Sequence, residues 1–239
     1  MRRRRPYELV VARDRQRDSL GAVARLTIEH DAVDDEPTAR TRRRSIALRL
    51  DGKAWLRVEP EVLFELEVTE DDEVDDERRV AIEDALARAR ARLFVVRSLA
   101  VRMQSRAELA RKLAARDVPS EIADEAIERA AGYGYVDDAA LAGQLARGMR
   151  ARGYGRRRTE QKLRSRGLSG ALAEAALAES YDDGENEETL ARRALGRRAV
   201  AGDADRKRAI AYLARRGFSA RAAWKAVQQA AEESPPGTV

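Results

Sequence analysis

The spacing of apolar residues changes near residue 80, from a period of two to a period of three to four. Before that point, four short segments alternate apolar and polar positions, as half-buried strands do. They are YELVVARD from Tyr7, AVARLTIEH from Ala22, SIALRL from Ser45 and KAWLRV from Lys53. The N-terminal part of the chain is therefore predicted to be a small β-containing region.

The last two of these strands are predicted to form a hairpin. They flank Asp51-Gly52, a dipeptide that adopts the positive φ angles of a two-residue turn at low cost. Pro60 then favours the first turn of a short helix that extends to Leu66. The polar segment 31–44 predicts a mobile loop between the second and third strands.

After Asp76 the apolar positions follow the helical period, and one helical pattern is written three times. KLAARDVPSEIADEAI begins at residue 112, KLRSRGLSGALAEAAL at 162 and YLARRGFSARAAWKAV at 212, fifty residues apart. Three apolar slots and one arginine slot coincide: Leu113, Leu163 and Leu213; Val118, Leu168 and Phe218; Ile127, Leu177 and Val227; Arg116, Arg166 and Arg216. Gly167 and Gly217, with Asp117 in the first copy, stand where a helix ends in a left-handed residue.

Each copy needs one further helix ahead of it, which the spacing places at 81–103, 138–152 and 187–200. We therefore expect a mainly α protein. Three tandem three-helix repeats should form an elongated curved array, preceded by a small N-terminal region that contains a β-hairpin. The expected boundaries are 1–75 for the N-terminal region with its acidic linker, 76–136, 137–184 and 185–232 for the repeats, and 233–239 for a disordered tail.

These assignments lead to three expectations about stability. Leu163→Asp should unfold the central repeat, because it would place an unpaired carboxylate in a buried slot. Arg166→Ala, in the polar slot beside the turn, should cost little. Deleting residues 1–44 should leave a folded, helical and binding-competent protein, since the repeats have apolar slots of their own.

Composition agrees with long amphipathic helices. The 239 residues are 44% hydrophobic, 37% charged and only 5% aromatic. There is no cysteine, which excludes disulfides and thiolate metal sites. No apolar run approaches the roughly 20 residues of a membrane span, and the apolar stretch in MRRRRPYELVV is too short for a signal peptide. We expect a cytoplasmic protein, monomeric and without contact to a membrane.

Positive charge is concentrated in blocks, although the formal net charge is only +5. Residues 147–166 contain nine bases and the single acid Glu160, and residues 192–225 contain eleven bases and two acids. Blocks of this density favour phosphate or an acidic protein surface as the partner. The alternative is that these arginines only form solvated helix faces.

Catalytic signatures are nearly absent. His30 is the only histidine, and no phosphate-binding loop of the GxxxxGK[ST] type occurs. The acidic run DDEVDDE from Asp71 lacks the central glycine of a calcium loop, and we interpret it as a solvated linker. We expect no catalytic residues, no metal site and no cofactor.

One segment resembles a known family. GYVDDAALAGQLARGMRARGYGRRRTEQKLRSRGLS, at 134–169, resembles the central repeat of RecX, the regulatory protein of the RecA recombinase. RRGFS at 215–219 resembles the third repeat of that family, and SRAEL at 105–109 the first. The chain departs from the family at Leu141, where an aromatic residue is usual, and segment 7–44 has no counterpart that we recognise.

The resemblance implies a regulator that lies in the helical groove of the RecA filament on single-stranded DNA. It would inhibit ATP hydrolysis, strand exchange and the RecA-assisted cleavage of repressors. The expected contact residues lie mainly in the central repeat, where Arg158, Lys162 and Arg166 are four apart and should form one ridge. The full set is Arg147, Arg150, Arg152, Arg156, Arg157, Arg158, Lys162, Arg164, Arg166, Arg215 and Arg216.

The main alternative is a sequence-nonspecific DNA-binding helical array, such as a nucleoid protein or a transcription factor with hidden helix-turn-helix modules. Trp224 could stack on a base, but we favour its packing within the third repeat. Asp137 and Asp138 are assigned to a helix start and not to a metal.

Overall fold

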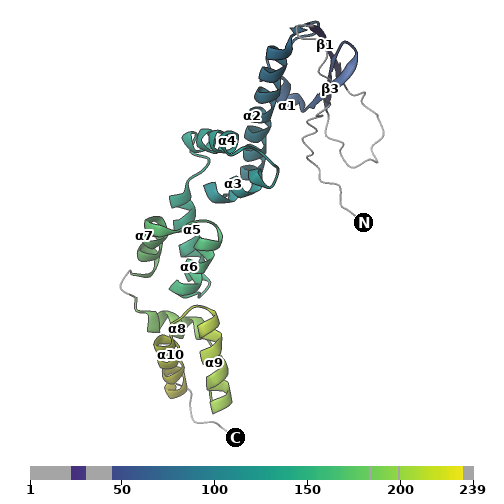
Figure 1. Cartoon of the computed structure of the whole chain (residues 1–239). Helices are drawn as coiled ribbons and strands as arrows, with labels where there is room; N and C mark the ends of the chain where they lie inside the picture. Colours follow the sequence, from purple (N-terminus) through teal and green to yellow (C-terminus); the bar gives the residue numbers. More distant parts are fainter. Residues whose placement is uncertain (1–22, 31–44, 183–184, 199, 234–239) are drawn as a thin grey trace. The chain divides into compact units, whose positions relative to one another are not determined.

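The computed structural model describes residues 23–30, 45–182, 185–198 and 200–233 (Figure 1). The chain divides into two compact units, each described here by itself. The first contains residues 1–101 and 110–132, and the second contains residues 102–109 and 133–239. Residues 102–109, which the sequence places in the first repeat, thus belong to the second unit.

The first unit contains a four-stranded antiparallel sheet with the strand order β3-β2-β1-β4. Its strands are β1 (Ala24–His30), β2 (Ile46–Leu50), β3 (Lys53–Val58) and β4 (Glu73–Val74). The hairpin turn is confirmed, because Asp51 and Gly52 have φ angles of 48° and 74°. The predicted strand at Tyr7 and the predicted loop 31–44 lie outside the described residues.

The interpretation of the acidic run as a solvated linker is wrong. Within it, Glu73 and Val74 form β4, which pairs with β1. The side chain of Val74 is 3% exposed and belongs to the core between the sheet and the helices. A strand of two residues is too short to produce an alternating pattern, and the surrounding acids conceal the one buried valine.

Helices complete the first unit. They are α1 (Pro60–Leu63), α2 (Asp76–Val101), part of α3 (Arg106–Ala114) and α4 (Ser120–Gly132). Ile82 and Leu86 of α2 pack with Leu26 of β1 and Leu48 of β2 in one core. Because β1 lies between β2 and β4, removing residues 1–44 would delete a central strand. The deletion should therefore disrupt the sheet of the first unit, and the expectation that the remaining chain stays folded and helical remains a prediction.

The second unit holds two complete three-helix repeats. One consists of α5 (Asp138–Ala151), α6 (Arg156–Ser165) and α7 (Gly170–Tyr181), the other of α8 (Glu187–Leu195), α9 (Asp203–Arg215) and α10 (Ala220–Glu233). In each repeat the first helix packs against the third. Helix α8 ends at Leu195, earlier than predicted, because Gly196 has a φ of 60° and terminates it. Glu233, expected in the tail, is the last residue of α10.

The slots that recur every fifty residues are confirmed as core positions. Eight of the nine apolar side chains are buried, and Val118 is half-buried. The turn residues have the predicted left-handed conformation, with φ angles of 59° at Asp117, 77° at Gly167 and 90° at Gly217. In each copy the backbone amide after the turn residue donates to the carbonyl of the recurring leucine: Val118 to Leu113, Leu168 to Leu163 and Phe218 to Leu213.

Neighbouring repeats of the second unit meet backbone to backbone. The amide of Gly155, at the start of α6, donates to the carbonyl of Arg216 at 2.8 Å. A Cβ atom on Gly155 would lie 2.5 Å from the carbonyl oxygen of Gly217. Fifty residues earlier, the hydroxyl of Ser105 donates to the carbonyl of Arg166. In both cases the turn that follows the second helix of one repeat is hydrogen-bonded to the residue that precedes the second helix of the repeat before it.

Candidate binding surface

The exposed face of α6 is basic. Arg157, Arg158, Lys162 and Arg164 are exposed on it, while Thr159 and Leu163 face the core. The helical period produces this division, since the buried residues are four apart. Arg164 is paired with Glu160 at 2.5 Å, and Arg158 donates to the side chain of Gln161 at 3.2 Å.

Helix α9 repeats this arrangement fifty residues later. Lys207 and Arg208 stand at the positions of Arg157 and Arg158, and both are exposed. Arg215, one of the predicted contact residues, is also exposed at the end of α9. Lys207 and Arg208 are not among the predicted contact residues, although the offset of fifty that aligns the leucines also aligns them with Arg157 and Arg158.

Besides Arg164, three further predicted contact residues at the surface of the central repeat are engaged in ion pairs. Arg147 pairs with Glu179 at 3.0 Å, Arg156 with Asp182 at 2.8 Å and Arg150 with Glu185 at 2.8 Å. Exposed pairs contribute on the order of 0–1 kcal/mol, so a phosphate or carboxylate of a partner could replace the first two acids. Arg152 is exposed, and its Nε donates to the carbonyl of Gly148.

Arg166 has a structural role, which corrects both its place in the predicted ridge and the expectation that Arg166→Ala costs little. Its side chain is only 15% exposed and forms an ion pair with Glu108 at 2.7 Å. It also donates to the carbonyl of Met103 at 2.9 Å. The ridge fails at this position because α6 ends at Ser165, so the spacing of four no longer sets the direction of the side chain.

Glu108 is the shared acceptor of this junction. Ser105 and Glu108 form the capping box that begins α3, with two reciprocal bonds of 3.1 Å. Arg102 is a second cation on the same carboxylate, at 3.1 Å. Burial alone would raise the pKa of Glu108. The bonds from Arg102, Arg166 and the Ser105 amide outweigh burial, so the pKa lies below its usual value.

Arg216 repeats the role of Arg166 at the next junction. Its Nη1 donates to the carbonyls of Arg152 and Gly153, at 2.6 and 2.9 Å. Its guanidinium lies 4.8 Å from the ring centroids of both Tyr154 and Tyr212. We therefore correct the assignment of Arg216 as an exposed contact, since these interactions hold its guanidinium against the neighbouring repeat.

The aromatic residues divide between surface and junction. Trp224 is 56% exposed, so our interpretation that it packs within the repeat is wrong. Its position aligns with Asp124 and Glu174, which are exposed as well. Asp137 caps α5 as predicted, accepting from the Ala140 amide at 2.8 Å. Asp138 accepts from the Arg106 amide at 3.0 Å, so it caps α3 and not its own helix.

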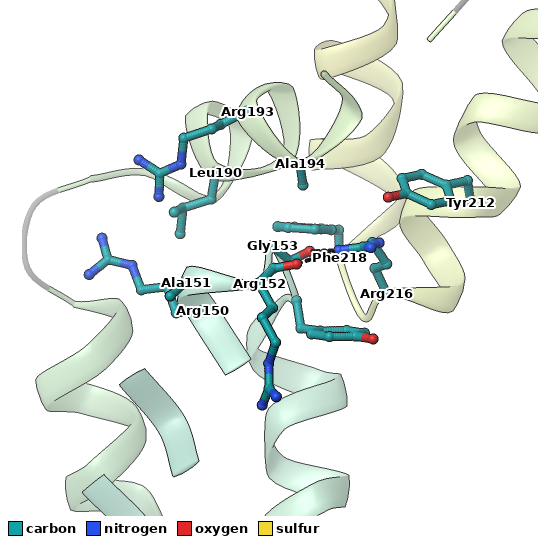
Figure 2. Close-up of a pocket in the computed structure, with 11 residues that line it drawn as sticks. Arg150, Ala151, Arg152, Gly153, Leu190, Arg193, Ala194, Tyr212, Arg216 and Phe218 are labelled. Carbon is teal, nitrogen blue, oxygen red and sulfur yellow. Dashed lines mark hydrogen bonds between the residues drawn. The ribbon is translucent and has the colours of Figure 1, made fainter. Parts of the chain in front are cut away.

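A pocket of about 280 Å³ lies where the two repeats of the second unit meet (Figure 2). It is lined by the end of α5 with the turn that follows, by α8 and by the end of α9 with its turn. The lining residues are Arg150, Ala151, Arg152, Gly153, Tyr154, Leu190, Arg193, Ala194, Tyr212, Arg216 and Phe218. Four of them are arginines and none is acidic.

Among the described residues there is no cluster of three or more His, Asp or Glu side chains that could hold a metal ion. None of the described helices combines the length and the apolar character that a membrane crossing requires.

These tandem three-helix units define a protein of the helical-repeat class. Comparison with known proteins identifies the family. A model described as the first three-helix domain of RecX matches residues 91–129, and one described as the second matches residues 137–177. The chain belongs to the RecX family, a family of regulatory proteins.

Individual relatives support this assignment. The chain is 38% identical over 146 residues to the regulatory protein RecX of Deinococcus radiodurans, covering 60% of this chain and 69% of that protein. It is 37% identical over 118 residues to the protein of the same name from Xanthomonas campestris pv. campestris (strain B100), covering 49% and 73%. A crystal structure of a regulatory protein RecX has the same fold, with a TM-score of 0.58 and 21% identity over 89% of this chain and 100% of that one.

Proposed function

We propose that this protein regulates RecA by binding its filament on single-stranded DNA, in the helical groove. Bound there, it inhibits ATP hydrolysis, strand exchange and coprotease activity. Membership of the RecX family supports the target. The observation that carries the proposal is the equivalent display of cations on α6 and α9, at Arg157 and Lys207 and at Arg158 and Arg208.

A repeated display suits a repeated target. DNA presents phosphates at regular intervals, and a filament presents its subunits at regular intervals, so each repeat would meet an equivalent contact. In this proposal the protein acts as a monomer in the cytoplasm. Guanidinium groups bind phosphates and carboxylates equally well, so protein and DNA could both be contacted.

The test is the ATPase activity of RecA on single-stranded DNA, measured with competing naked duplex present. Wild-type protein should inhibit at near-stoichiometric levels despite the competitor. Replacing Arg157, Arg158 and Lys162 by Glu should abolish inhibition while leaving the fold intact, because all three are exposed. Arg156 is left out of this variant because it is paired with Asp182.

The matched control carries the same change of charge elsewhere. Lys53, Arg57 and Arg129 are exposed residues of the first unit, and replacing them by Glu should leave inhibition intact. If excess naked duplex removes the inhibition by the wild-type protein, the chain only sequesters DNA. The alternative of a nonspecific DNA-binding array would then replace the proposal.

A further inference from the structure

The pocket between the two repeats of the second unit is more basic than the packing of the repeats requires. Four arginines line it, and two of them, Arg150 and Arg193, come from the first helices of adjacent repeats. Figure 2 shows their guanidinium groups extending on the same side of the pocket. Its volume of about 280 Å³ lies just below the usual range for sites of drug-sized ligands and is enough for a small anion.

Glu185 marks a position at which these two arginines hold an oxyanion. One of its carboxylate oxygens accepts from Nη2 of Arg150 at 2.8 Å, and the other accepts from Nη1 of Arg193 at 2.9 Å. Two guanidinium groups thus converge on the two oxygens of one planar anion. A phosphate group presents oxygens with a similar spacing, and a guanidinium fork binds them with short, charge-assisted bonds.

The rest of the pocket lowers the cost of a bound anion. The last carbonyls of α5 carry partial negative charge and would oppose it. However, the carbonyls of Arg152 and Gly153 already accept from Arg216, and that of Gly148 accepts from Arg152. Since one of these carbonyls lies in the last turn of α5 and two follow its end, the bonds offset part of the negative charge there. The turn after α5 is also held by the hydroxyl of Tyr181, which donates to the carbonyl of Tyr154 at 2.9 Å.

We propose that this pocket binds a phosphate group, which replaces the Glu185 carboxylate between Arg150 and Arg193. Arg193 is well suited to capture it, because its side chain is 61% exposed and can reach solvent. Tyr154 and Tyr212 also line the pocket, and the guanidinium of Arg216 lies against both rings. The phosphate comes either from a free nucleotide or from the backbone of a single strand. The inference does not depend on RecA.

Isothermal titration of the full chain with inorganic phosphate, adenosine 5′-monophosphate and a short oligo(dT) tests this proposal in the absence of RecA. Arg193→Ala should weaken phosphate binding by about tenfold, the effect of losing one charge-assisted contact. The matched control is Arg197→Ala, an exposed arginine just beyond α8 that does not line the pocket. It should bind phosphate as the wild type does.

Glu185→Gln provides a test in the opposite direction. It removes the competing negative charge and keeps a hydrogen-bond acceptor, so phosphate should bind several-fold more tightly. Damage to the fold would not increase the affinity for phosphate. If Arg193→Ala also weakens oligo(dT) binding, the ligand is a strand; if it affects only phosphate and the mononucleotide, the ligand is a free nucleotide. Equal phosphate affinity in all variants would overturn the proposal, whatever the outcome of the RecA assay.

Discussion

Gly155→Ala should uncouple the two repeats of the second unit. Gly155 has an ordinary φ of −80°, so alanine adds no backbone strain. Its Cβ, however, would lie 2.5 Å from the oxygen and 2.7 Å from the carbon of Gly217, and 2.9 Å from the nitrogen of Phe218. All three atoms belong to the backbone, so no side chain can rotate away. The repeats must separate at this point.

The expected cost has two parts. Overpacking of a tight contact costs about 1–3 kcal/mol. Separation also lengthens the bond from the Gly155 amide to the Arg216 carbonyl, now 2.8 Å, and the loss of such a bond costs about 0.5–1.5 kcal/mol. Together they amount to about 1.5–4.5 kcal/mol. With a urea m-value of about 2 kcal/mol/M, the unfolding midpoint should fall by about 1–2 M.

Gly202→Ala is the matched control. Gly202 is the residue before α9, as Gly155 is the residue before α6, and it too has a negative φ of −118°. A Cβ on Gly202 would meet nothing within 4 Å. The effects of the substitution on helix capping and on the entropy of the unfolded chain are therefore the same in both variants. Only the contact of the new Cβ atom with the neighbouring backbone differs. Urea titration followed by circular dichroism should show a large shift for Gly155→Ala alone; equal midpoints for the two variants would refute the backbone contact as a coupling element.

Three further predictions concern the second unit. Leu163→Asp should lower the free energy of unfolding by several kcal/mol, because Leu163 is fully buried; an unchanged melting temperature would contradict the shared apolar slot. Arg166→Ala should lower the free energy of unfolding by about 2–4 kcal/mol, because Glu108 would lose its less exposed ion-pair partner and keep only Arg102. In the same urea titration, Arg164→Ala should cost less than about 1 kcal/mol, because its ion pair with Glu160 is exposed. Because its folded pKa is lowered, Glu108 contributes stability that is complete above its unfolded pKa of about 4.3 and is lost as the pH falls through the folded value. The stability gap between wild type and Glu108→Gln should therefore shrink below about pH 4, and a gap that stays constant would argue against this ion-pair cluster.

The repeat architecture was predictable because its signals are local and occur more than once. A leucine, a left-handed turn residue and a second apolar residue recur at the same offset, and each copy confirms the alignment of the others. The strand β4 occurs once, in two residues, and its pairing with β1 depends on contacts between distant segments. Such pairing leaves no period in the sequence, which explains why the acidic run was misread.

The arginines show a different limit to what recurrence in the sequence can predict. A residue that binds a partner and a residue that joins two repeats are both expected at a fixed offset, so recurrence alone cannot separate them. Arg158 and Arg208 lie inside helices, where the helical phase directs them outward. Arg166 and Arg216 follow the last residue of α6 and α9, where the chain turns and their guanidinium groups reach carbonyls of the preceding repeat.

Helix boundaries therefore decide which recurring cations a partner can reach. Within α6 and α9 the phase is fixed by the buried leucines, Leu163 and Leu213, and a cation two turns from the helix end must point away from them. Beyond the helix end that constraint is lost, and carbonyls left without helical partners attract the guanidinium instead. The same arginine-rich composition thus supplies a binding surface within the helices and the junctions between repeats at their ends.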